Sequence, residues 1–187
     1  MPRRRTINAP GHWHFLTFSV YRRKQLLVSD WSRDLVCGQL DAARQHLDYD
    51  IIAYVIMPEH VHVLVRPRQH EYDVGNFRGM LKRKVADAVR ARLLELGRDD
   101  WIESLTVTDN GRKKFRFWQK GGGYDENLWS QRPILAVIDY IHDNPVRRGL
   151  VQRPEDWRYS SAEWFISRRE GNTPTDDVPL IPDPIRW

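Results

Sequence analysis

Residues 49–66, YDIIAYVIMPEHVHVLVR, hold two apolar segments that only a Pro-Glu pair separates. Both segments are rich in β-branched and other apolar residues, so they predict two strands, over 49–57 and 60–66, joined as a hairpin. Successive side chains of a strand point to opposite faces, which places His60 and His62 on one face and the valines on the other. The valine face can pack into a core, and the fold must then accommodate two imidazoles side by side on the opposite face.

A pair of histidines on one face of a strand is a candidate metal site. Imidazole nitrogens are common metal ligands, and this spacing puts two of them next to each other. The alternative for the motif alone is two surface histidines on a half-exposed strand, because short motifs often match by chance. The rest of the chain must therefore supply a further ligand or a reactive group before a site is predicted.

The remaining elements follow from hydrophobic periodicity and from turn residues. In chain order we predict a strand over 12–21, a helix over 31–47, the hairpin, a helix over 72–96, a second hairpin that turns at Asn110-Gly111, and a helix over 132–143. The last helix is expected to stop at Asn144, because Pro145 disfavours helix in the residue before it. This order predicts an α+β, ferredoxin-like fold, in which helices pack on one face of an antiparallel sheet.

A single domain over 1–187 is expected, because 187 residues suit one core and no repeat or long linker divides them. Residues from about 151 onward are expected to form a C-terminal extension. Cys37 is the only cysteine, which excludes internal disulfides and a cysteine zinc site and favours a reducing compartment. No apolar run approaches the roughly 18–20 residues of a membrane span. We therefore expect a cytoplasmic protein without a membrane segment.

Basic and aromatic residues are interleaved along the chain. There are 30 Lys and Arg residues against 25 Asp and Glu residues, a net charge of +5, with eight tryptophans and seven tyrosines. This combination suits a nucleic-acid surface, where cations meet phosphates and aromatic rings meet unstacked bases. The alternative, equally open from composition, is solvated charge around a tryptophan-rich core. The candidate DNA contacts are Arg22, Arg23, Lys82, Arg83, Arg147, Arg148 and Arg158.

The predicted helix RPILAVIDYIHDNP carries a phenol and a carboxamide one turn apart. Tyr140 and Asn144 are four residues apart, so they share a helix face, which is rotated away from the isoleucines. A phenol beside a carboxamide oxygen can supply a nucleophile next to a metal ligand. The alternative for this helix alone is a core tyrosine, followed by an asparagine that caps the helix.

The segments HWHFLTFSVYRR, MPEHVHVLV, YIHDNPVRRGLV and PEDWRYSS follow one another along the chain. In this order of motifs the chain resembles the REP-associated tyrosine transposases, single-tyrosine members of the HUH nuclease superfamily. The resemblance spans most of the chain, and its separate motifs agree. It implies a ferredoxin-like core with the histidines on a central strand. It also implies that His60 and His62 are metal ligands, that Asn144 completes the metal site, and that Tyr140 is the nucleophile.

The activity implied by this resemblance is that of a metal-dependent, single-stranded DNA endonuclease and strand transferase that cleaves at hairpin or repeat sites. The tyrosine would attack a phosphodiester and leave a 5′-phosphotyrosine and a free 3′-hydroxyl. Histidine nitrogens and an amide oxygen permit Mg²⁺ or Mn²⁺ as the divalent metal. The expected partner is single-stranded or hairpin DNA at the nucleoid. A monomer is favoured over a homodimer, because the chain offers no obvious dimerisation strand.

Two departures from the family pattern bear on the substrate. The segment between the long helix and FWQ is longer than in compact members, and WQKGGGYDENL stands where the family commonly reads Trp-Gln-Arg-Arg-Phe. Both are expected near the DNA path, so the alternative function is a non-cleaving, hairpin-specific DNA-binding protein derived from a transposase. Tyr124, which follows the three glycines, is the reserve nucleophile.

Three further histidines are weaker candidates for the site. His12 and His14 are a second pair at strand spacing, and they could contact DNA or simply lie at the end of a strand. His142 does not share the helix face of Tyr140, so it is expected to be exposed to solvent.

Overall fold

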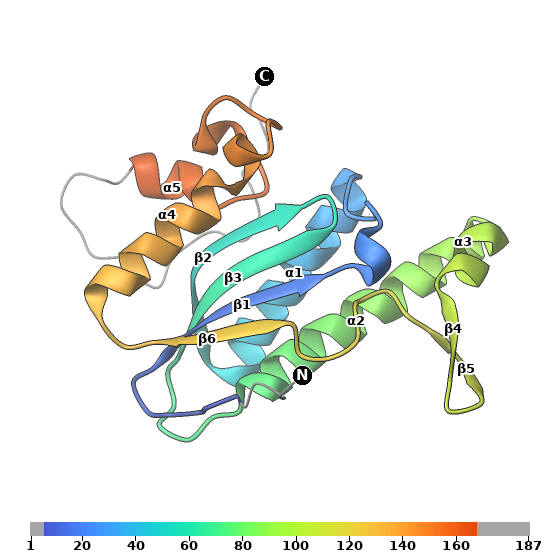
Figure 1. Ribbon diagram of the computed structural model, residues 1–187, viewed down its shortest axis with the longest axis horizontal. Coiled ribbons are helices and arrows are strands. Elements are labelled where there is room, and N and C mark those ends of the chain that lie inside the picture. Colours follow the sequence, from blue (N-terminus) through green and yellow to red (C-terminus); the bar gives the residue numbers. More distant parts are fainter. Residues whose placement is uncertain (1–5, 168–187) are drawn as a thin grey trace.

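The computed structural model describes residues 6–167, which form a four-stranded antiparallel sheet with helices on both faces (Figure 1). The strand order is β2-β3-β1-β6. The strands of this sheet are β1 (Trp13–Ser19), β2 (Tyr49–Met57), β3 (His60–Pro67) and β6 (Tyr124–Leu128). With one long helix after β1 and another after β3, this is the β-α-β-β-α-β order of a ferredoxin-like fold. The predicted α+β class and the predicted hairpin are confirmed.

Helices cover both faces of the sheet. On one face lie α1 (Asp30–Leu47) and α2 (Val74–Glu95), which enclose the core that includes the valines of β3. On the other face lies α4 (Gln131–Arg147), whose Ile138 and Ile141 pack against the apolar side chains of β2. The sequence had predicted helices on one face only, and this part of the prediction is wrong, because α4 covers the second face. Strand β2 is apolar on both of its faces, so each face needs a cover.

Helix α4 continues past the residue at which it was expected to stop. Asn144 and Pro145 both lie inside the helix, and both are buried. Proline removes one backbone donor and disfavours helix before it, but this local preference is outweighed by the packing of the helix end against the rest of the protein. The Asn144 side chain also donates to the Tyr140 carbonyl at 2.6 Å, which supports this turn. The helix therefore ends at Arg147, seven residues after Tyr140.

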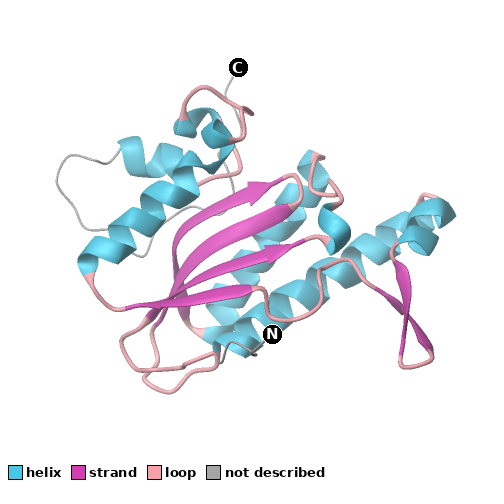
Figure 2. Cartoon of the chain, in the orientation of Figure 1, coloured by secondary structure: helices cyan, strands magenta, loops and turns pink. Residues whose placement is uncertain are grey.

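Between α2 and β6 the chain forms α3 (Asp99–Ser104) and a hairpin of β4 (Thr106–Asp109) and β5 (Arg112–Phe115). This hairpin stands apart from the four-stranded sheet (Figure 2). The predicted turn at Asn110-Gly111 is confirmed, with φ values of 52° and 73°, as a two-residue hairpin turn of this kind requires. Helix α3 was not predicted, because six residues are too few for a periodic signal.

The chain after α4 folds back towards β2. A 3₁₀ turn, η2 (Pro154–Asp156), and a short helix, α5 (Ala162–Ser167), follow, and Ser160 forms a β-bridge with Val55. Part of the C-terminal extension predicted from about 151 is thus attached to the sheet, whereas 168–187 lie outside the described residues. The single domain over 1–187 stays a prediction.

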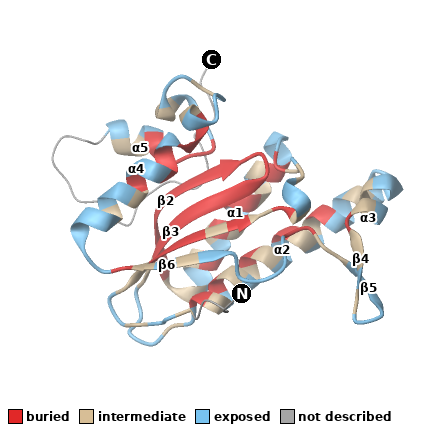
Figure 3. Ribbon diagram, in the orientation of Figure 1, coloured by how far each residue is buried: buried red, intermediate tan, exposed pale blue. Residues whose placement is uncertain are grey.

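The double cover buries the two strands of the predicted hairpin (Figure 3). His60 and His62 are only 5% and 4% exposed, although their rings lie on the face opposite the valines. Polar groups that are largely buried usually have hydrogen-bond partners within the protein. The fold therefore places two imidazoles in a setting where partners for their ring nitrogens are expected.

The glycine loop approaches β1 more closely than any side chain allows. Gly123 has a φ of +79°, and a Cβ added there would lie 2.1 Å from the Thr17 carbonyl oxygen. Gly121 also has a positive φ, of +92°, but nothing lies within 4 Å of the position of its Cβ. The positive φ of both residues suits glycine. Only at Gly123 does the close packing also require that there is no Cβ atom.

We expect Gly123→Ala to lower the free energy of unfolding by about 3 kcal/mol and Gly121→Ala by about 1 kcal/mol, because only the first adds a steric clash to a strained φ. Urea denaturation followed by circular dichroism measures both values. Equal losses in the two variants would contradict the close packing of the loop against β1.

Candidate functional site

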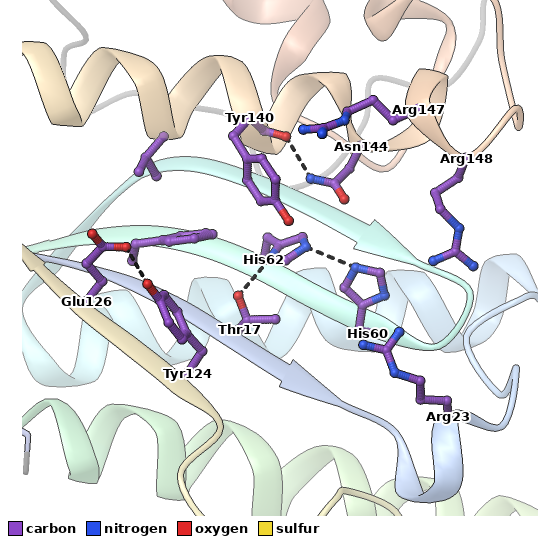
Figure 4. Close-up of a pocket in the computed structure, with 12 residues that line it drawn as sticks. Thr17, Arg23, His60, His62, Tyr124, Glu126, Tyr140, Asn144, Arg147 and Arg148 are labelled. Atoms are coloured by element: carbon purple, nitrogen blue, oxygen red, sulfur yellow. Dashed lines mark hydrogen bonds between the residues drawn. The ribbon is translucent and has the colours of Figure 1, made fainter. Parts of the chain in front are cut away.

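A pocket of about 730 Å³ lies between the sheet and α4 (Figure 4). Its lining residues come from β1, β3, β6, α4 with the residue that follows it, and the 3₁₀ turn η1 (Tyr21–Arg23). They are Phe15, Thr17, Arg23, His60, His62, Tyr124, Glu126, Val137, Tyr140, Asn144, Arg147 and Arg148. The structure thus brings together the two histidines, the tyrosine and the asparagine that the sequence had singled out, from a strand and a helix far apart in the chain.

His60 and His62 reach the pocket from β3, and their Nε2 atoms lie 3.0 Å apart. The Nδ1 atom of each ring has a separate partner behind it. His60 Nδ1 lies 3.2 Å from Glu59 Oε1, and His62 Nδ1 lies 2.7 Å from Thr17 Oγ1. Both rings are therefore held at their Nδ1 edge, and the two Nε2 atoms face each other.

Burial keeps both imidazoles neutral at neutral pH. Burial, together with the neighbouring His60, lowers the pKa of His62 to about 3. Burial also lowers the pKa of His60, although the charge of Glu59 opposes this shift. A neutral imidazole has a nitrogen lone pair for a metal ion, whereas a protonated ring has none. The pair can therefore bind a cation near neutral pH.

Tyr140 projects from α4 beside the histidines (Figure 4). It is 40% exposed, and its ring meets those of His62 and Phe15 edge-on, with centroid distances of 5.4 and 5.9 Å. One turn later, the Asn144 amide nitrogen donates to the Tyr140 carbonyl, and the Asn144 side chain also bonds to His62. With its nitrogen used on the helix, Asn144 offers its oxygen to the imidazole. The predicted sharing of one helix face by the tyrosine and the asparagine is confirmed.

The donor atoms of the pocket fit a divalent metal ion. Neighbouring ligands of an octahedral ion at about 2.1 Å lie about 3.0 Å from each other, and the two Nε2 atoms are 3.0 Å apart. Asn144 adds an oxygen donor beside His62. Within residues 6–167, no group of three or more His, Cys, Asp or Glu side chains could hold a metal. A site here would therefore depend on the two imidazoles and the amide oxygen, without a carboxylate or thiolate.

Three of the predicted DNA contacts line the pocket, namely Arg23, Arg147 and Arg148. Arg147 lies over the tyrosine ring, with its guanidinium carbon 5.5 Å from the ring centroid. Arg23 and Arg148 come from opposite sides of the first histidine (Figure 4), and both interact with Glu59, at 3.7 and 2.9 Å. The pocket is thus bordered by three cationic side chains.

The other predicted DNA contacts do not line the pocket. Lys82 on α2 donates to two backbone carbonyls within 119–121, at 3.2 and 2.8 Å, and burial lowers its pKa to about 8. Its ammonium group therefore holds the glycine loop. Arg158 lies 3.9 Å from an aspartate of α1. Arg22 and Arg83 are exposed.

The second histidine pair lies outside the pocket. His14 points to the opposite face of the sheet, where its Nδ1 lies 2.8 Å from Asp125 Oδ1 and its Nε2 lies 2.9 Å from the Tyr72 hydroxyl. Both of its nitrogens are thus used in a buried network. His12 stacks on Trp129, with ring centroids 5.1 Å apart.

His142 is buried, so its predicted exposure to solvent is wrong. Its Nε2 lies 2.8 Å from Ser161 Oγ, and its ring centroid lies 4.9 Å from that of Phe165. The chain after α4 covers this side of the helix, which the pattern of the helix alone could not indicate. The reserve nucleophile, Tyr124, does line the pocket, and its hydroxyl donates to Glu126 at 2.7 Å.

Two residues that hold the histidines were not foreseen. Thr17 lies opposite His62 in the pairing of β1 with β3, and no local pattern specifies that register. Glu59 directly precedes His60, but a carboxylate in a turn between strands is normally expected to be exposed. Its burial follows from the cover that α4 and η1 provide.

Residues 10–144 match the family described as "Transposase IS200 like". The chain is 24% identical to a candidate REP-associated tyrosine transposase of Haemophilus influenzae. The alignment spans 153 residues, which are 81% of this chain and 80% of the relative. It is 22% identical over 158 residues to the REP-associated tyrosine transposase of Escherichia coli, with coverage of 84% and 80%. A solved structure of a REP-associated tyrosine transposase bound to a REP hairpin has the same fold, with a TM-score of 0.71, 19% identity and 96% coverage of both chains.

Across the described part of the chain, no helix combines the length and the apolar character needed to cross a membrane. The family match includes the strand with both histidines and the helix as far as Asn144. The resemblance to REP-associated tyrosine transposases is thereby confirmed. On the strength of this match, the chain belongs to the IS200-like transposase family.

Proposed function

We propose that this protein is a metal-dependent endonuclease and strand transferase for single-stranded DNA, which acts at hairpin or repeat sites through a 5′-phosphotyrosine intermediate. The observation that carries this function is that the Tyr140 phenol shares one pocket with two neutral histidines and three arginines. A nucleophile, a pair of metal ligands and a group of cations are what phosphodiester transfer requires. The solved relative that is bound to a REP hairpin supports hairpin DNA as the substrate.

In the proposed reaction the Tyr140 oxygen attacks the phosphorus of a phosphodiester, and the bond from phosphorus to the 3′ oxygen breaks. The tyrosine loses its proton and the departing oxygen gains one, so the products are a 5′-phosphotyrosine and a 3′-hydroxyl. One phosphate ester replaces another in this step. A second 3′-hydroxyl can therefore attack the phosphotyrosine and rejoin a strand without ATP.

The residues around the tyrosine have separate proposed roles. Edge contacts with Phe15 and His62 hold the Tyr140 ring in place, and the three pocket arginines bind the phosphates next to the scissile one. His60, His62 and Asn144 hold the divalent ion, either Mn²⁺ or Mg²⁺. When bound, the ion polarises the scissile phosphate and lowers the barrier to attack.

The second candidate function is hairpin-specific DNA binding without cleavage. The glycine loop favours it, because this loop replaces the sequence that is usual in the family and borders the pocket through Tyr124. Such a protein would bind hairpin DNA in a salt-sensitive manner and give no product with any divalent ion. Metal-dependent hydrolysis without a covalent step would instead give product but no adduct.

The proposed substrate also suggests where and in which form the protein acts. Chromosomal DNA as the substrate places the proposed activity in the cytoplasm, at the nucleoid. One chain supplies both histidines, the tyrosine and the asparagine to the same pocket. We therefore favour a monomer over a homodimer as the acting form.

Tyr140→Phe is expected to abolish covalent capture of DNA, because phenylalanine keeps the ring packing but has no nucleophilic oxygen. Single-stranded hairpin DNA labelled at its 3′ end is incubated with the protein and Mn²⁺, and adducts are detected on a denaturing gel. Tyr124→Phe is the matched control, since it removes the other phenol that lines the pocket. An adduct that persists in Tyr140→Phe and disappears in Tyr124→Phe would transfer the role of nucleophile to Tyr124.

His60→Ala and His62→Ala are each expected to abolish cleavage while hairpin affinity stays within about tenfold, or about 1.4 kcal/mol. Metal binding depends on three side chains, two of them these histidines, whereas DNA affinity is spread over many basic groups. Cleavage and fluorescence-anisotropy assays on the same hairpin separate the two effects.

Val61→Thr is the control for the histidine variants, because Val61 is fully buried on the opposite face of β3. It introduces a buried hydroxyl, and we expect lower stability with cleavage retained. Near-normal cleavage by a folded His62→Ala protein would remove the metal role from the pair.

A further inference from the structure

Glu59 is a buried carboxylate for which the proposed reaction has no role. It lies in the turn between β2 and β3, directly before His60, and is 3% exposed. Its Oε1 lies 3.2 Å from His60 Nδ1, accepts from Arg148 at 2.9 Å, and lies 3.7 Å from Arg23. Its Oε2 is buried without a hydrogen-bond partner. A buried charge is costly, so a carboxylate at this place points to a specific role.

The chemistry of Glu59 determines which nitrogen of His60 carries the hydrogen. Glu59 Oε1 accepts from the guanidinium of Arg148 at 2.9 Å, and Arg23 lies 3.7 Å from the same oxygen, so this oxygen acts as an acceptor. The hydrogen between the two side chains therefore belongs to the imidazole. A neutral ring has one such hydrogen, so His60 carries it on Nδ1 and keeps the lone pair on Nε2.

The tautomer of His62 follows from that of His60. The two Nε2 atoms lie 3.0 Å apart, and the Nε2 atom of His60 has no hydrogen to donate. His62 is then the donor through its own Nε2, which leaves its Nδ1 to accept from the Thr17 hydroxyl at 2.7 Å. In the structure the hydrogen bonds of these four side chains thus run in one direction, from Thr17 through both histidines to Glu59.

An ion held by both Nε2 lone pairs would require only His62 to change its tautomer. The hydrogen of His62 would move from Nε2 to Nδ1, and the number of protons on the ring would be unchanged. The Thr17 hydroxyl can follow this change, because it is able both to donate and to accept. Glu59 is fixed as an acceptor, and it lies at the Nδ1 edge of His60, away from an ion bound at Nε2.

We propose that Glu59 is a positioning residue of the metal site. It holds His60 in the tautomer that can bind a metal, and it thereby sets the direction of the hydrogen bonds of His62 and Thr17. This role rests on the proposed function, since it takes the two histidines as metal ligands. It adds a residue that acts on the metal through His60. Carboxylates behind ligating imidazoles typically change metal affinity by about 10–100-fold.

Glu59→Gln tests this role, because glutamine has nearly the same size but its amide can also donate to His60 Nδ1. The opposite tautomer, with a hydrogen on Nε2, then becomes accessible. We expect the affinity for Mn²⁺ to fall at least tenfold, measured by isothermal titration calorimetry on the full-length, metal-free protein without DNA. Glu163→Gln is the matched control, since it removes the same charge from an exposed position of α5.

A spectroscopic measurement separates positioning from a purely structural ion pair. In protein labelled with ¹⁵N-histidine, long-range ¹H–¹⁵N correlation spectra distinguish the two tautomers of each ring. The wild-type protein is expected to show His60 with its hydrogen on Nδ1, and Glu59→Gln a mixture. A structural ion pair would affect the thermal stability of the variant and leave both the tautomer and the Mn²⁺ affinity unchanged.

A second pair of variants tests the same hydrogen bonds from strand β1, should Glu59→Gln not fold. Thr17→Val removes the partner of His62 Nδ1 and is expected to weaken Mn²⁺ binding, whereas Thr17→Ser keeps the hydroxyl and should preserve it. Equal Mn²⁺ affinity in wild type, Glu59→Gln and Thr17→Val would overturn this role and leave the proposed function intact. Absence of Mn²⁺ binding in the wild-type protein would overturn both.

Discussion

The burial of two imidazoles in a sheet that is covered on both faces is the constraint on which the site depends. His60 and His62 are only 5% and 4% exposed, and their ring nitrogens are paired with each other, with Thr17 and with Glu59. The same burial lowers the pKa of both rings and keeps them neutral. A single physical cause, burial, therefore both orders the rings and keeps them neutral.

Apolar packing places the tyrosine over this pair. The isoleucines of α4 pack against the sheet, and the helix then holds Tyr140 beside His62 and brings the Asn144 oxygen to the same ring. Because α4 continues through Pro145, its last turn also carries Arg147 to the border of the pocket. Tyr140 and the arginine beside it are thus positioned by the hydrophobic contact between helix and sheet.

The loop that departs from the family pattern supports the site from behind. Gly123 packs on the backbone of Thr17, whose side chain in turn holds His62. Lys82 fixes the same loop through two backbone carbonyls, so its charge is used inside the protein. The glycine loop is therefore compatible with an ordered pair of histidines.

The sequence by itself determined the hairpin with its two opposite faces, the α+β order of elements, and the shared helix face of Tyr140 and Asn144. These features depend on contacts between residues close in the chain, so periodicity and turn residues reveal them. Only the tertiary structure decided that α4 covers the second face, that His142 is buried, that Glu59 and Thr17 hold the histidines, and which arginines border the pocket. Each of these depends on strand register or on segments that meet from distant parts of the chain, and local patterns do not encode such contacts.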